Sequence, residues 1–350
     1  MNTVTVKTDH PYEILIGSGI LPQLGQRIRD LTKAGKIALV SETNVYPIWG
    51  RTVTEILEAT GFTVLPFVFP AGEDSKCAHT YLDLLNHLAE NHLTRTDLIL
   101  ALGGGVTGDL AGFAAATYLR GIPFVQLPTS LLAAVDSSVG GKTAIDLPAG
   151  KNLAGAFYQP RLVLCDLDLL TTLPEDIFRD GCAEVIKYGI LYDPELFSHL
   201  QANGLAFDRK WVITRCVELK RDVVEQDEFD RGLRMKLNLG HTIGHGVEAA
   251  SRYGISHGKA VAIGTAIIIR SAEKNGLCSR ETAHQVLSLL KAFGLPTESD
   301  YSPETLADFA LSDKKRAGDQ VSLIIPREIG LCQVVPTPVE DLVSLIKAGF

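Results

Sequence analysis

The segment 97–152 constrains the fold of this chain most strongly, because a strand, a glycine turn and a helix follow one another directly. Residues 98–102 form an apolar run that is typical of a buried strand. Gly103, Gly104 and Gly105 come next, and an alanine-rich helical segment over about 106–118 follows. Glycine lets a backbone approach an anion, and the free amides of a first helical turn can bind it. The segment therefore predicts a phosphate-binding turn, although a tight turn that binds nothing has the same pattern.

Polar residues in the same segment indicate a site rather than a solvated face. They stand among small apolar residues, and they are Asp109, Arg120, Asp136, Lys142, Lys151 and Asn152. Such a mixture of cations, carboxylates and an amide is suited to binding a polar, anionic ligand.

Strands and helices alternate through the first half of the chain. Short apolar runs predict strands at 4–7, 12–17, 36–40, 62–69, 98–102, 124–127 and 162–165. The alternation predicts parallel βαβ units in an α/β sheet. Helical patterns dominate from about 175 to 309, before a late β pair. We therefore expect an α/β domain over 1–173 with a mostly parallel nucleotide-binding sheet, and a mainly α-helical domain over 174–350.

Polar residues at predicted strand ends indicate where a ligand would bind. Ligands of such sheets bind beyond the carboxyl ends of the strands, where Glu42, Glu73 and Thr129 fall beside the glycine turn. An acidic residue in the position of Glu42 commonly holds a ribose diol. A helix cap formed by Ser41 or Thr43 is the alternative explanation for this polar edge.

Composition limits the classes of partner. The 350 residues carry a formal charge of −8, and no basic run indicates nucleic acid or an anionic membrane as a partner. The six cysteines are scattered without a CxxC pair, as is usual in a reducing compartment. The longest apolar run, 260–269, is too short to cross a bilayer. No signal peptide is visible, and we expect a cytoplasmic protein without a nucleic-acid or membrane partner.

The second half contains three candidate spots for metal chemistry. Glu184 and Lys187 lie three residues apart within an apolar helix, and a surface ion pair is the alternative. His241 and His245 are spaced to project from one helix face, which suits either a metal or a pair of hydrogen-bonded histidines. His257 stands in the glycine-flanked run ISHGKAV. A Glu with two His would make a three-ligand catalytic zinc site, but the spacing does not decide which two histidines take part.

The motifs taken together resemble the 3-dehydroquinate synthase family over nearly the whole chain. They read GGGVTGDLAGFAAATYLRGIPFVQLPTSLLAAVDSSVGGKT, GKNLAGAFYQP, GCAEVIKYG, LRMKLNLGHTIGHGVEAA and SHGKAV. The resemblance implies a phosphate-eliminating cyclase of the shikimate pathway, which converts 3-deoxy-D-arabino-heptulosonate 7-phosphate to 3-dehydroquinate and phosphate. It implies NAD and a divalent metal, zinc or cobalt, as cofactors. Transient oxidation, phosphate elimination, re-reduction and aldol closure would follow one another on one substrate.

The resemblance also assigns residues. The metal ligands would be Glu184, His241 and His257, and His245 would then face the substrate. The catalytic positions match Asp136, Lys142, Lys151, Asn152, Lys187, Asn238 and His245. Substrate contacts match Arg120, Lys142, Asn152, Lys187, Lys220, Arg234, Asn238, His245 and Lys314, with Arg120 reaching a neighbouring subunit of a homodimer. NAD contacts match Glu42, Asn44, Glu73, Lys76, Gly104, Gly105, Val106, Asp109, Thr129, Ser130, Lys142, Lys151 and Thr172.

Three other functions share part of this pattern. Another sugar phosphate cyclase would act on a substrate without a carboxylate, and the cluster of lysine and arginine residues argues against it. A metal-dependent alcohol dehydrogenase of the glycerol dehydrogenase type would have a similar glycine turn but would release NADH stoichiometrically. A binding protein that senses NAD or metal would not need the full set of substrate residues.

Overall fold

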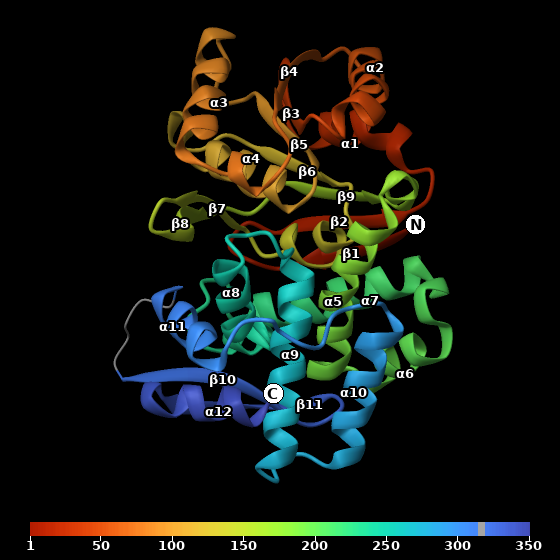
Figure 1. The fold of residues 1–350 in the computed structure, drawn as a ribbon. Coiled ribbons are helices and arrows are strands. Elements are labelled where there is room, and N and C mark those ends of the chain that lie inside the picture. The colour runs from red at the N-terminus through yellow and green to blue at the C-terminus, as the bar shows by residue number, and fades with distance from the viewer. Residues whose placement is uncertain (314–318) are drawn as a thin grey trace. The chain divides into compact units, whose positions relative to one another are not determined.

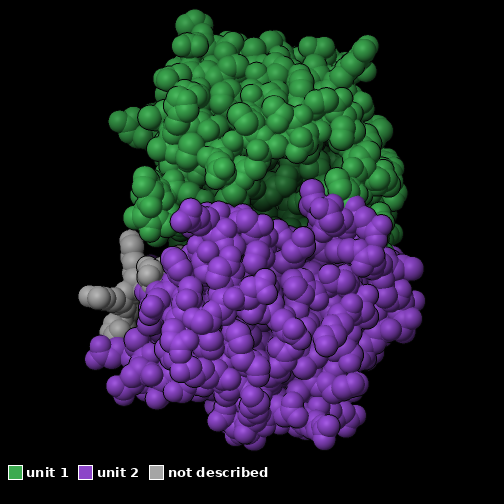
Figure 2. All heavy atoms as spheres, viewed as in Figure 1, with its two compact units in different colours: residues 1–174, 209–229 green, residues 175–208, 230–350 purple. Residues whose placement is uncertain are grey.

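A computed structural model describes residues 1–313 and 319–350, and this part of the chain divides into two compact units (Figures 1 and 2). Unit 1 comprises Met1–Pro174 and Arg209–Phe229, and unit 2 comprises Glu175–Asp208 and Asp230–Phe350. The helix α7 (Arg209–Gln226) therefore belongs to the first unit, although it lies beyond residue 174 in the sequence. The predicted division into domains 1–173 and 174–350 stays a prediction.

A seven-stranded sheet forms the centre of unit 1. Its order is β1-β2-β9-β6-β5-β3-β4, and only β1 pairs antiparallel to its neighbour. The strands are β1 (Asn2–Val6), β2 (Tyr12–Gly17), β3 (Lys36–Glu42), β4 (Thr63–Phe69), β5 (Leu98–Gly103), β6 (Phe124–Pro128) and β9 (Leu162–Asp166). Because their carboxyl ends meet at one edge, residues that follow β3, β5 and β6 are brought together.

Helices cover both faces of this sheet, and the sequence of the central strands shows why (Figure 1). Leu98, Leu100 and Leu102 of β5 pack with α1 (Leu24–Leu31) and α2 (Arg51–Ala59). The alternate residues Ile99 and Ala101 pack with the helices of the other face. Those helices are α3 (Ala78–Glu90) and α4 (Gly105–Thr117). A strand that is buried on both faces requires the continuous apolar run that the sequence contains.

A two-stranded hairpin, β7 (Lys142–Leu147) and β8 (Gly150–Phe157), also belongs to unit 1. The sequence did not predict it, because its residues are mostly small or polar and do not alternate as a half-buried strand does. Its pairing is antiparallel, with an irregularity between Ile145 and Leu147. Gly155 is required here, since a Cβ at this position would lie 2.2 Å from the carbonyl oxygen of Thr143.

Unit 2 is mainly helical. Its helices are α5 (Glu175–Tyr192), α6 (Pro194–Asn203), α8 (His241–Ala250), α9 (His257–Lys274), α10 (Arg280–Ala292), α11 (Pro303–Asp313) and α12 (Leu342–Ala348). Helix α9 is mostly buried and contacts α5, α8, α10 and α12. Gly264 permits the close packing of α9 on the turn before α8, because a Cβ there would lie 2.1 Å from the carbonyl oxygen of Gly240.

An antiparallel pair, β10 (Gln320–Glu328) and β11 (Leu331–Pro338), completes unit 2. The predicted fold class is confirmed: a mostly parallel sheet with helices lies in the first half, and a mainly helical part follows. Within the described residues, every helix is too short or too polar to traverse a bilayer.

Candidate active site

The glycine turn joins β5 to α4 as the sequence predicted. The backbone N–H of Thr129 donates to the carbonyl of Gly103 (3.0 Å), which ties the end of β6 to the turn. A Cβ on Gly104 would lie 3.3 Å from Ser130 Oγ, and one on Gly105 would lie 3.3 Å from Ser137 Oγ. Small residues therefore leave the first turn of α4 accessible, and the dipole of this 13-residue helix favours an anion at its N-terminus.

Glu42 is the last residue of β3, where it pairs with Phe69 of β4. Its carboxylate accepts hydrogen bonds from the backbone N–H groups of Asn44 (2.6 Å) and Val45 (3.0 Å). Ser41 and Thr43 are engaged elsewhere, with Leu102 and Ala71 respectively, so neither caps the following helical turn.

Thr172 contacts the segment that follows β3, through the aromatic side chain of Trp49. The indole N–H of Trp49 donates to its hydroxyl oxygen at 3.0 Å. Trp49 was not predicted as a site residue, and no motif around it would have indicated this contact.

A buried lysine connects the candidate NAD residues. Lys76 is only 4% exposed, and its Nζ lies 2.7 Å from Asp109 and 3.6 Å from Glu73. Burial by itself would lower the pKa of Lys76, but the two carboxylates outweigh burial and raise that pKa. Burial raises the pKa of Asp109, and Lys76 opposes the rise. Lys151 also approaches Glu73, at 3.7 Å, so cations and carboxylates alternate through this network.

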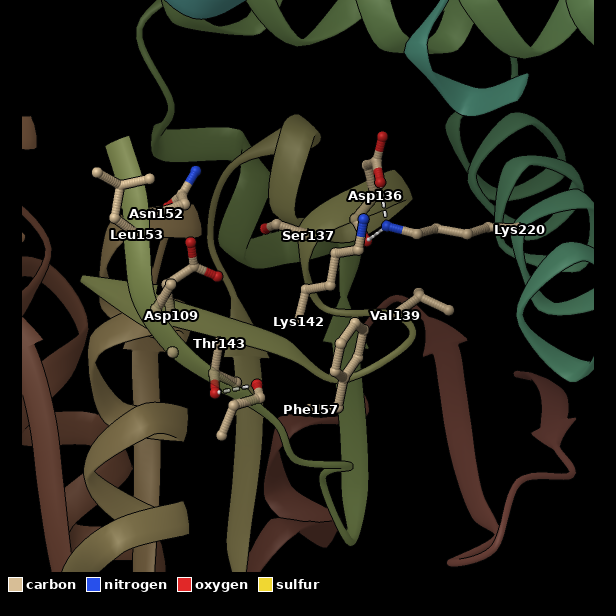
Figure 3. A pocket seen from close by; sticks show the side chains of 13 residues that line it. Asp109, Asp136, Ser137, Val139, Lys142, Thr143, Asn152, Leu153, Phe157 and Lys220 are labelled. Carbon is tan, nitrogen blue, oxygen red and sulfur yellow. Dashed lines mark hydrogen bonds and ion pairs between the residues drawn. The ribbon is translucent and has the colours of Figure 1, made fainter. Parts of the chain in front are cut away.

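A cavity of about 550 Å³ opens beside this network in unit 1 (Figure 3). Lys220 of α7 reaches Asp136 in the cavity wall and forms an ion pair with it. Figure 3 shows the amino group of Lys142 directed toward the same pair. Asn152 and Asp109 line the opposite part of the wall. The wall thus carries two lysines and an amide, which can bind an anionic ligand, together with the carboxylates of Asp109 and Asp136.

Glu184, His241 and His257 form a compact cluster in unit 2. Their ligand atoms all lie within 4.8 Å of one another. The Nε2 atoms of both histidines lie 3.3 Å from the same carboxylate oxygen of Glu184, which is fully buried. One carboxylate and two imidazoles are the donor set of a catalytic zinc site.

The backbone around each histidine determines how its ring is presented. His241 and His257 are the first residues of α8 and α9. The Nδ1 of His241 donates to the carbonyl of Leu239 at 3.0 Å, and the Nδ1 of His257 lies 3.4 Å from Glu248. With Nδ1 engaged in this way, the Nε2 lone pair is left for a metal.

Charges around Glu184 favour its ionised form. Its second oxygen forms an ion pair with Lys187, three residues later on α5 and only 2% exposed. Burial would raise the pKa of Glu184, but Lys187 and the two histidines overcome burial and hold that pKa well below the ordinary value. The ion pair lies in the interior rather than on a surface, so the alternative considered for these two residues does not apply.

A second set of three residues shares His257. Ligand atoms of His245, Glu248 and His257 also lie within 4.8 Å of one another. His241 and His245 thus fall in two different sets of possible ligands, which share His257. Sequence reasoning missed Glu248, although its position three residues after His245 and seven after His241 places it on the same helix face.

The remaining predicted substrate residues are placed as follows. Arg234 is buried and Asn238 is half-buried, and both lie in the 3-10 segment Leu233–Asn238 of unit 2. Arg120 is exposed in unit 1. Lys314 lies outside the described residues. The assignments of individual residues to metal, NAD and substrate remain predictions.

Comparison with known proteins identifies the family. The family model for the N-terminal part of 3-dehydroquinate synthases matches residues 66–180. The family model for the C-terminal part matches residues 181–316. A 3-dehydroquinate synthase of Pelobacter propionicus is 46% identical, with 99% of each chain covered.

Solved structures show the same architecture. A 2-deoxy-scyllo-inosose synthase complexed with carbaglucose-6-phosphate, NAD+ and Co2+ has a TM-score of 0.89 at 26% identity, with all of both chains covered. A 2-epi-5-epi-valiolone synthase from Streptomyces hygroscopicus, with NAD+ and Zn2+ bound, also has a TM-score of 0.89, at 25% identity over 99% of this chain and 98% of that chain. With two family models that together match more than half of its length and a relative of such identity, the chain belongs to the 3-dehydroquinate synthase family.

Proposed function

We propose that the chain converts 3-deoxy-D-arabino-heptulosonate 7-phosphate to 3-dehydroquinate and phosphate, using the residue sets described above. Its family membership supports the function that the motifs predicted. The observation that carries the proposal is the combination of a Glu184–His241–His257 cluster with a cavity lined by lysines. The reaction needs a Lewis acid for the substrate alcohol. It also needs several cations, because the substrate carries a phosphate and a carboxylate.

The two cofactors fit residues that are present. Glu184, His241 and His257 would hold zinc or cobalt, and the turn between Gly104 and Gly105 would hold the pyrophosphate of NAD. When bound, the metal supplies a Lewis acid for the substrate alcohol and NAD supplies a hydride acceptor that later returns the hydride. The side chains bind the substrate, orient it and transfer protons.

Cationic residues and neutral hydrogen-bond donors would hold the substrate anions. Lys142, Asn152, Asn238, His245 and Lys314 are suited to the phosphate. Lys220 and Arg234 are suited to the carboxylate, since the planar guanidinium of arginine can bind both carboxylate oxygens. Both Lys220 and Arg234 are almost fully buried, and a buried cation is costly unless an anion accompanies it. Asp136 supplies that partner for Lys220. The substrate carboxylate would therefore take the place of the Asp136 carboxylate beside Lys220.

The proposed reaction predicts catalytic phosphate release without net redox change. We expect the metal-loaded chain with NAD to release phosphate from the heptulosonate phosphate over many turnovers, while absorbance at the NADH wavelength stays flat. Chain treated with a chelator is the control and should be inactive. Stoichiometric NADH formation would instead indicate a dehydrogenase.

Another sugar phosphate cyclase is the second candidate, because solved cyclases of that kind have the same fold at 25–26% identity. Curated 3-dehydroquinate synthases are considerably more similar, at 42–46%. Sedoheptulose 7-phosphate and glucose 6-phosphate lack the carboxylate that Lys220 and Arg234 would bind. Turnover of either substrate at a kcat/KM equal to that of the heptulosonate phosphate would favour the second candidate.

We also infer that the chain works as a homodimer in which Arg120 serves the neighbouring active site. Leu119, Arg120 and Gly121 all have positive φ values, of 50°, 68° and 121°. Consecutive left-handed residues make a sharp bend that presents the exposed Arg120 outward, which suits contact with another subunit. A cytoplasmic location stays a prediction from the cysteine usage.

Mixing two inactive variants tests the role of Arg120. We expect Arg120→Ala and Lys142→Ala to be inactive alone, and a mixture refolded together to regain about a quarter of wild-type activity, since half of the dimers would hold one intact site. Unmixed variants at the same total concentration are the control. A mixture as inactive as its components would show that Arg120 acts within its own subunit or that no dimer forms.

A further inference from the structure

Asp146 of the β7–β8 hairpin connects two groups of candidate site residues but belongs to neither. It lies at the irregularity in the hairpin pairing, between Ile145 and Leu147. Its own backbone N–H donates to the carbonyl of Lys76 at 2.7 Å, and it pairs with Cys77 as an isolated parallel bridge. The backbone at Asp146 therefore attaches the hairpin to the segment that carries Lys76.

The side chain of Asp146 makes a second attachment. Its Oδ1 accepts a hydrogen bond from the backbone N–H of Asn152, on the opposite strand, at 2.7 Å. Asp146 is half-buried, and the bond is charge-assisted, which makes it stronger than a bond between neutral groups. One residue thus bridges the Lys76 segment and the strand that presents Asn152 to the cavity.

The backbone of Asn152 needs such support. Its φ is +55°, in the left-handed region that residues other than glycine rarely adopt. Asparagine tolerates this conformation better than most residues, but it still favours the extended or right-handed regions. Without a fixed acceptor for its N–H, the residue would relax to another conformation, and its side chain would leave its place in the cavity wall.

We propose that Asp146 is a positioning residue, which holds Asn152 in the left-handed conformation that directs the Asn152 amide toward the substrate phosphate. The proposal depends on the function proposed above for the identity of the substrate, but the contact between Asp146 and Asn152 does not.

Substitutions of Asp146 separate positioning from folding. In Asp146→Ala we expect the KM for the heptulosonate phosphate to rise about five- to tenfold, the effect of one lost hydrogen bond, while kcat changes less than about threefold. Asp146→Asn should restore most of the affinity, because the amide oxygen can accept the same bond. NAD affinity should stay within about twofold in both variants, since the backbone bond from residue 146 to Lys76 is retained.

Hydrogen exchange gives a readout that does not depend on activity. In Asp146→Ala, peptides covering 150–157 should exchange faster by about five- to tenfold, whereas peptides of β5 and β6 should be unchanged. Asp83→Asn removes a carboxylate from the exposed side of α3 and is the matched control, expected to resemble wild type throughout.

The outcomes distinguish the proposals. An unchanged KM in Asp146→Ala, or faster exchange spread over the whole sheet, would overturn the positioning role. If the wild-type chain has no activity on the heptulosonate phosphate, the proposed function fails. In that case exchange confined to the hairpin would still support the contact, and unchanged exchange in the hairpin would refute it.

Discussion

Glu184→Gln should lose the bound metal and nearly all turnover. Glu184 contributes the negative charge of the Glu184–His241–His257 cluster, and both imidazoles converge on one of its oxygens at 3.3 Å. A neutral amide is a poor ligand and offers an N–H group toward the same space. Loss of a residue that merely supports a ligand costs up to about 100-fold in metal affinity, so loss of the ligand itself should cost more. Metal content after dialysis against a chelator, and phosphate release, measure both effects.

The controls for Glu184 must separate metal loss from misfolding. Lys187 is buried beside Glu184, and an unpaired buried cation destabilises a protein by about 3–5 kcal/mol. The double variant Glu184→Gln/Lys187→Met removes that cation and should fold, yet remain free of metal. Glu175→Gln, on the exposed first turn of the same helix, should behave as wild type. A folded Glu184→Gln chain that retains one metal per subunit would refute the ligand assignment.

Lys76→Met should weaken both NAD binding and the stability of unit 1. The substitution keeps the length of the side chain but leaves the carboxylates of Asp109 and Glu73 without their common cation. Breaking a buried ion pair at one partner costs about 3–5 kcal/mol, which is a large part of the stability of a typical domain. We expect the dissociation constant for NAD to rise about 100-fold, by loss of a charge-assisted contact and disorder of the Glu73 segment. Fluorescence titration with NAD and denaturant unfolding measure the two effects.

A second substitution distinguishes these two consequences. In Lys76→Met/Asp109→Leu an apolar group replaces the Asp109 carboxylate that has lost its lysine. Stability should therefore recover, while NAD affinity should not. Lys36→Met, at the opposite end of β3 from Glu42, is the control for removal of another lysine from unit 1. Wild-type NAD affinity in a stable Lys76→Met chain would show that Lys76 has a structural role alone.

Local patterns predicted the parallel sheet well, because each central strand is buried on both faces. The apolar run 98–102 and the glycines after it correspond to β5 and the start of α4, with bounds that differ by one residue. Burial on two faces leaves a signal in the sequence that does not depend on distant contacts. The hairpin β7–β8 left no such signal, since many of its small and polar residues line the cavity instead of packing in a core.

In unit 2 the spacing of residues along the sequence indicated which kinds of side chain could bind a metal, but not how they are arranged in space. The residue pair His241 and His245 indicated a metal or a hydrogen-bonded pair, and helical spacing alone did not decide between them. The structure brings His257 and Glu184 to His241 from two other helices, and such contacts between distant segments have no local signature. Helix α7 illustrates the same limit, because its periodicity predicts a helix but does not indicate which unit it packs on.

The return of the chain to unit 1 limits how this gene can recombine. The chain passes between units at 174/175, 208/209 and 229/230. A crossover between two relatives near residue 180, where the two family models meet, would combine the sheet of one parent with the α7 of the other. Lys220 would then have to pair with a foreign Asp136, and Glu225 would have to accept the N–H of a foreign Lys7. A chimera should therefore keep these contacts when residues 209–229 come from the same parent as the sheet.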